Sequence, residues 1–109
     1  MTISTTTLKN AARALGYDLW SDPDGSHYLV DYDGVKLKRW DPEHDDGDSL
    51  RLAVMLRLDL TFYNGFQEVH VEVSRGDGVS PTIELDGEDL YKSVRTGILK
   101  EAAKIGAAL

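Results

Sequence analysis

An acidic cluster in the middle of the chain has the residue types and the spacing that chemistry requires. Five carboxylates fall within eight residues, directly before an apolar segment with helical spacing. The cluster consists of Asp41, Glu43, Asp45, Asp46 and Asp48. Carboxylate oxygens are the ligands that Mg²⁺ and Ca²⁺ prefer, so one hypothesis is a metal-dependent hydrolase that uses residues 41–48.

The order of these acids does not match a calcium-binding loop. Such a loop needs glycine at its sixth position and glutamate at its twelfth, which are Asp46 and Leu52 when counted from Asp41. The histidines stand far apart in the chain and complete no metal-ligand or catalytic motif. They are His27, His44 and His70. We therefore predict no bound metal, no cofactor and no catalytic residue.

Helix starts offer a simpler interpretation of the acids. The tripeptide Asp-Gly-acid occurs at residues 46–48 and again at residues 86–88, and an apolar helical segment follows each. An aspartate there accepts a hydrogen bond from a free backbone N–H, and its charge favours the helix dipole. We expect Asp46 and Asp86 to be the capping residues, with Asp89 in the first turn of the later helix. Since one cap leaves other acids of the cluster unexplained, we interpret the surplus as a surface for a basic protein partner.

Basic residues in two expected helices support a different hypothesis, an anion site. They are Arg51, Lys92 and Arg95. Guanidinium groups hold phosphates through paired hydrogen bonds, and aromatic side chains can stack on a base. A small protein that binds a nucleotide is therefore the alternative to a protein-binding one.

The net charge of −7 is concentrated in one region. Residues 41–89 carry three basic and thirteen acidic residues, a net charge of −10. An acidic region of this size disfavours direct nucleic-acid binding, because Lys and Arg supply most of the affinity for phosphates. The sequence has no cysteine, no long apolar run and no secretory signal at its start, so a cytoplasmic protein without disulfides or membrane spans is expected.

The spacing of apolar residues predicts the elements of the first half. A helix begins at Ser4 or Thr5 and ends near Gly16, which tolerates positive φ. Residues 17–40 alternate in polarity and contain two turn sequences, which predicts a three-stranded meander. Residues 47–58 form a second helix, whose apolar residues cover so broad an arc that we expect it to be largely buried.

The second half is expected to contain three more strands followed by a helix. Strands are expected at residues 59–63, 66–73 and 82–85, and an apolar stripe from Leu90 to Leu109 predicts the last helix. The prediction is a single α+β domain over residues 1–109, with the order α-β-β-β-α-β-β-β-α and mainly antiparallel strands.

Two segments carry a recognisable pattern, WDPEHDDGDSLRLAVMLRL at the second helix and DLYKSVRTGILKEAAKIGAAL at the last. Its residues are Trp40, Pro42, Asp45 or Asp46, Leu52, Ala53, Arg95 and Ala102. This pattern resembles the phage ABA sandwich domain, a family of small phage and prophage proteins. The resemblance implies a three-layer α/β/α sandwich encoded on a phage genome or prophage. It implies no known activity and hence no catalytic residues.

These observations together predict a small phage accessory protein that binds rather than catalyses, in the cytoplasm of a bacterial host. The expected partner is a host or phage protein with a basic surface, such as a component of a defence system. The expected state is a monomer or a small homo-oligomer. Nucleotide binding and metal-dependent hydrolysis remain the alternatives.

Overall fold

The architecture was analysed in a computed structural model, which describes residues 3–31, 33–64, 69–76, 79–85 and 89–109. Within these residues the chain forms three helices and two three-stranded antiparallel sheets, in the order α-βββ-α-βββ-α. The predicted α+β class and the predicted order of elements are confirmed. None of the helices in these ranges is long and apolar enough to span a membrane.

The first helix and the first sheet follow the local signals closely. Helix α1 (Thr5–Ala14) is capped by Ser4, which accepts a hydrogen bond from the backbone N–H of Thr7. Gly16 follows the helix with a φ of 86°, a conformation that costs glycine little. Strands β1 (Asp18–Ser21), β2 (His27–Val30) and β3 (Lys36–Arg39) then form the predicted meander, with β2 in the centre.

Helix α2 (Asp46–Leu56) begins and ends earlier than the predicted range of residues 47–58. Its N-cap is Asp45 rather than Asp46, so that prediction was wrong by one residue. The helix stops at Leu56 because Arg57 adopts the left-handed conformation, with a φ of 55°.

Strands β4 (Asp59–Asn64), β5 (Val69–Ser74) and β6 (Thr82–Leu85) form the second sheet, with β5 in the centre. Helix α3 (Leu90–Ala107) follows and is capped by Asp89, which accepts a hydrogen bond from the N–H of Lys92. The prediction of Asp86 as this cap was wrong, and residues 86–88 lie outside the described ranges.

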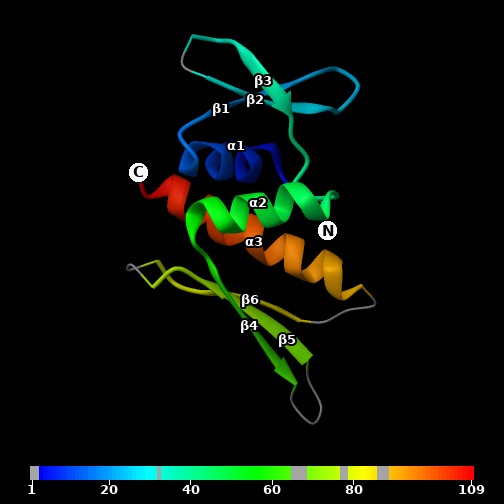
Figure 1. Cartoon of the computed structure of the whole chain (residues 1–109), viewed down its shortest axis with the longest axis vertical. Coiled ribbons are helices and arrows are strands. Elements are labelled where there is room, and N and C mark those ends of the chain that lie inside the picture. Colours follow the sequence, from blue (N-terminus) through cyan, green and yellow to red (C-terminus); the bar gives the residue numbers. More distant parts are fainter. Residues whose placement is uncertain (1–2, 32, 65–68, 77–78, 86–88) are drawn as a thin grey trace.

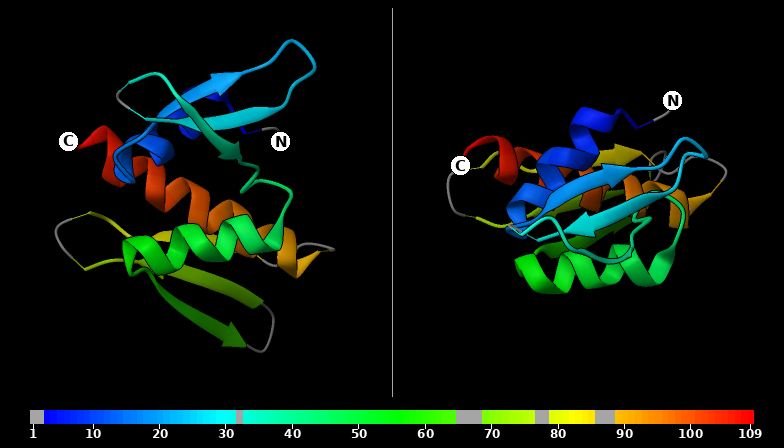
Figure 2. Two further views of the ribbon diagram at one scale, coloured as in Figure 1. Left: turned by 45° about the horizontal axis from the view of Figure 1, so that its top comes forward. Right: turned by 90° about the horizontal axis from the view of Figure 1, so that it is seen from above.

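The two sheets lie on the outside and the helices lie between them (Figure 1). Two further views give the same arrangement (Figure 2). Helix α3 packs against α1 and α2 on one side and against β5 and β6 on the other. The layers therefore run sheet, helices, sheet, whereas the family resemblance implies helices outside a central sheet.

A single apolar core joins these layers. It is formed by inward residues of all three helices together with side chains from both sheets. Its largest fully buried apolar side chains include Leu52, Val71, Ile98 and Leu99. Trp40, which follows β3, is only 2% exposed and connects the first sheet to the helices.

Candidate functional site

The acidic cluster lies at the junction of β3 and α2, and much of it is used to build that junction. Asp45 accepts a hydrogen bond from the N–H of Asp48 at 2.7 Å. Asp48 in turn accepts one from the N–H of Asp41 and one from Arg51, both at 2.9 Å. Asp41 accepts from the backbone and the ring of His44. These five hydrogen bonds close the turn onto the first turn of the helix.

The remaining acids of the cluster meet the last helix. Arg95 of α3 donates through Nε to the carbonyl oxygen of Glu43 at 2.9 Å and through Nη1 to Asp46 at 2.7 Å. This cross-link ties the start of α2 to α3. Four of the five carboxylates thus have a structural role, whereas Glu43 contributes its backbone carbonyl. Asp45 and Asp46 remain more than half exposed.

The surroundings of the Asp48 carboxyl at this junction lower its pKa. Burial alone raises this pKa, but hydrogen bonds from Arg51 and from the N–H of Asp41 outweigh that effect. The positive charges of Arg51 and Lys38 act in the same direction, and the net result is a lowered pKa. Asp48 is therefore an ionised structural carboxylate in the folded chain at neutral pH.

The other predicted ligand types are dispersed. Among the described residues, no group of three or more His, Asp and Glu side chains is arranged to hold a metal ion. His44 belongs to the α2 junction, His27 contacts Ser21 at 2.7 Å, and His70 stacks on the ring of Tyr63.

The predicted anion site is divided between different places. Arg51 pairs with Asp45 and Asp48, whereas Arg95 pairs with Asp46. The two guanidinium groups line different hollows of the surface, and the side chain of Lys92 is exposed on α3. The structure therefore gives these three residues no common site for a phosphate.

The two faces of α2 differ in burial, although both carry apolar residues. Leu52, Ala53 and Leu56 face the core, as expected. The opposite face carries three exposed apolar side chains, which we call the α2 ridge. These are Leu50, Val54 and Met55, which are 58%, 63% and 70% exposed. The prediction of a largely buried helix was therefore wrong for one of its two faces.

An apolar groove lies on one side of the α2 ridge. This β3–α2 groove has a volume of about 510 Å³ and runs between the first sheet and the helix. Its apolar walls include Tyr17, Leu29, Leu37, Trp40, Val54 and Met55. Lys38 and Arg51 provide its charged edge.

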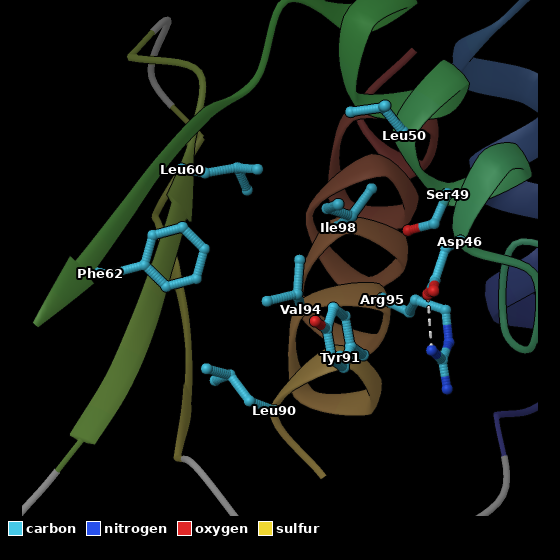
Figure 3. Close-up of a pocket in the computed structure, with 10 residues that line it drawn as sticks. All are labelled: Asp46, Ser49, Leu50, Leu60, Phe62, Leu90, Tyr91, Val94, Arg95 and Ile98. Atoms are coloured by element: carbon cyan, nitrogen blue, oxygen red, sulfur yellow. Dashed lines mark hydrogen bonds and ion pairs between the residues drawn. The ribbon is translucent and has the colours of Figure 1, made fainter.

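A second apolar groove lies on the other side of the ridge, between α2, α3 and β4. This α2–β4 groove has a volume of about 470 Å³. Figure 3 shows Leu60 and Phe62 of β4 facing Leu90, Tyr91, Val94 and Ile98 of α3 across it. It exists because α3 packs mainly on β5 and β6 and leaves the inner face of β4 less covered. Leu50 lines both grooves, so they form one apolar surface.

This apolar surface was not predicted from the sequence, although the pattern of apolar residues in α2 is compatible with it. The apolar residues of α2 occur on all sides of the helix, and that pattern predicts either full burial or an uncovered apolar face. Only the positions of the two sheets decide between these outcomes. Exposed apolar patches of this kind mark interaction sites in soluble proteins.

No family model, curated protein or solved structure matches this chain. Most residues on which the phage-family pattern rests are packing residues. Trp40, Leu52, Ala53 and Ala102 are each less than 5% exposed, and Pro42 is fully buried. The pattern therefore consists mainly of residues that pack in the core and not of residues on the exposed surface.

Proposed function

We propose that this chain is a non-enzymatic binding protein whose α2 ridge and flanking grooves dock onto a partner protein. The observation that carries the proposal is the exposure of Leu50, Val54 and Met55 in the middle of a regular helix. Solvent gives apolar side chains no favourable contact, whereas a partner that buries them gains about 25 cal/mol for each Å².

The total surface area of the chain is larger than its mass predicts. The chain exposes 6851 Å². A monomer with its mass of 12.1 kDa is expected to expose about 6000 Å². The excess of roughly 800 Å² is close to the area that one partner contributes to a standard interface.

The charge next to the ridge favours a basic partner. Five acids lie at the amino end of α2. Arg51 and Arg95 pair with three of them, and His44 lies beside Asp41 and Glu43. A partner surface with apolar residues beside Lys or Arg would match this order of ridge and acids. A host or phage protein in the bacterial cytoplasm, such as a defence component that holds nucleic acid, has that chemistry.

Site-specific photo-crosslinking tests this proposal in bacterial cells. A photoreactive phenylalanine analogue at Val54 should give one discrete conjugate with a protein of basic isoelectric point. The same analogue at Lys9, an exposed position on α1, is the matched control and should give none.

The purified conjugate partner then allows a quantitative test. Val54→Ser combined with Met55→Ser should weaken binding at least tenfold, and added salt should weaken it further. A conjugate of twice the chain's own mass would instead show that a second copy covers the ridge. An absence of conjugates at Val54 would reject the proposal.

A further inference from the structure

We propose that the α2–β4 groove is a binding site for an amphipathic carboxylate, a ligand with an apolar body and one carboxylate end. The site shares this groove and Leu50 with the partner surface proposed above, but ligand binding there can be measured on the chain alone, so the two proposals can fail separately. The inference rests on three features that converge there: apolar walls, an anchored guanidinium and a buried hydroxyl without a partner.

The walls suit the apolar body of such a ligand. Seven of the ten side chains that line the groove are apolar or aromatic, and its volume of about 470 Å³ lies within the usual range for small-molecule sites. Ile98 at its base is 2% exposed, while Phe62 and Tyr91 at its mouth are 51% and 71% exposed. A ligand chain would cover the apolar surface that water now contacts.

Arg95 is placed to receive the carboxylate. Its side chain is only 14% exposed, and the bond from Nε to the carbonyl oxygen of Glu43 holds it independently of any ligand. Its other bond goes to Asp46, whose side chain is 66% exposed (Figure 3). A ligand carboxylate can therefore replace an exposed carboxylate on a guanidinium that stays in place, so the charge balance of the groove is kept.

Ser49 provides the second polar contact. The residue is 2% exposed and lines the groove, and no described residue hydrogen-bonds to its Oγ. Figure 3 shows this oxygen turned toward α3. A buried hydroxyl without a partner costs free energy. A change of rotamer, which is easy for serine, would let it donate to a carboxylate oxygen held by Arg95.

The donor set selects the charge of the ligand. One guanidinium and one hydroxyl match a single negative charge, and the apolar walls disfavour a strongly hydrated dianion such as a phosphate monoester. An ammonium group would face Arg95 and would be repelled. Fatty acids and the carboxyl terminus of an apolar peptide share the required chemistry.

Calorimetric titration of the full chain with decanoate tests the site, with decanol and decylamine as probes of the same chain length. Decanoate should bind at least fivefold more tightly than decanol, and decylamine should bind more weakly than both. Acetyl-Phe-Leu-Leu with a free or an amidated carboxyl terminus shows whether a peptide end supplies the carboxylate.

Three substitutions make the test specific. Asp46→Asn removes the competing carboxylate and should tighten decanoate binding about threefold or more. Ser49→Ala removes the unpartnered hydroxyl, should leave the unfolding temperature unchanged or raised, and should weaken decanoate binding about threefold to tenfold. Arg13→Gln, which removes an exposed guanidinium of α1 outside the groove, should leave binding unchanged.

Each outcome of these titrations either supports or rejects the proposed carboxylate site. Carboxylate-dependent binding of decanoate or of the free peptide end, with opposite effects of Asp46→Asn and Ser49→Ala, supports the site. Equal binding of decanoate and decanol would reduce the groove to an unspecific apolar surface. No heat with any probe at millimolar concentration would overturn the proposal.

Discussion

At the scale of single residues, Asp48 shows how an acidic cluster can be structural. Its side chain is 13% exposed and accepts hydrogen bonds from Arg51 and from the N–H of Asp41. These bonds favour the ionised form, which is why the pKa is lowered despite burial. A carboxyl whose pKa is lower in the folded state than in the unfolded state stabilises the fold above its ordinary pKa.

The variant Asp48→Asn should therefore have a pH-dependent effect. We expect it to lower the free energy of unfolding by about 1–2 kcal/mol at pH 7. The difference from the parent chain should shrink as the pH falls below the usual carboxyl value of 3.8, because the Asp48 carboxyl of the unfolded chain takes up a proton there, whereas that of the folded chain does so only at lower pH. Urea unfolding at pH 7 and at pH 3 measures both values, and an equal difference at the two pH values would contradict this explanation.

Glu101 of α3 is a second acid with a structural role. Its side chain is completely buried, and its Oε1 accepts a hydrogen bond from Thr82 at 2.8 Å. Lys104 lies 3.6 Å from the same oxygen, whereas Oε2 has no hydrogen-bond partner among the described residues. The hydrogen bond from Thr82 therefore matters more to this buried side chain than it would to an exposed one.

Loss of the Thr82 hydroxyl should therefore lower the stability of the fold. We expect Thr82→Val to lower the free energy of unfolding by about 1–3 kcal/mol, since the buried carboxyl group of Glu101 loses its hydrogen-bond partner. Thr82→Ser keeps the donor and should cost only about 1 kcal/mol for the lost methyl group. Equal losses for both variants in chemical unfolding would show that the hydrogen bond contributes nothing.

At the scale of the elements, the crossing of α1 and α3 depends on one glycine. A Cβ atom added at Gly106 would lie 1.7 Å from the carbonyl oxygen of Asn10 in the backbone of α1. Backbone cannot move aside without separating the two helices. At Gly97, by contrast, the nearest atom is a methyl group of Val73 at 3.0 Å, and a side chain can adjust.

The same substitution should therefore give different results at these two positions. Gly106→Ala should lower the free energy of unfolding by about 3 kcal/mol or more through overpacking. Gly97→Ala should change it by less than about 1 kcal/mol, because the gain in helix propensity offsets the closer contact. Thermal unfolding of both variants measures this, and a stable Gly106→Ala chain would show that the helices do not cross this closely.

At the scale of the whole molecule, the chain is elongated and its two sheets are held apart by helices. The extents are 50 × 31 × 20 Å. The radius of gyration is 13.9 Å, whereas a compact chain of this length has a value of about 13 Å. This separation leaves one face of α2 without a layer above it, and it explains how a small protein can display an apolar ridge and two grooves.

Substitutions on opposite faces of α2 test that arrangement. Val54→Ser on the exposed face should change the free energy of unfolding by no more than about 0.5 kcal/mol. Leu52→Ala on the inner face, where Leu52 is 1% exposed, should lower it by about 2–5 kcal/mol. A large loss of stability in Val54→Ser, measured by urea unfolding, would mean that the ridge is covered within the chain itself.

The sequence determined the elements, because their signals are local. Turn sequences, alternating strands and the apolar stripe of the last helix each depend on neighbours within a few residues. The predicted order of three helices and six strands was therefore correct, and Ser4, one of the two residues predicted to begin α1, is its cap. The caps of α2 and α3 were displaced along the chain because several acids in each stretch could accept the same hydrogen bonds.

Tertiary structure alone decided what these elements display. Asp45 and Asp46 suit a helix start equally well. Asp46 forms an ion pair only because the fold places Arg95, which is 49 residues away in the sequence, beside it. In the same way, the all-round apolar pattern of α2 does not specify which side will be covered. That choice depends on where two distant sheets pack, and it turned Leu50, Val54 and Met55 from expected core residues into the candidate binding surface.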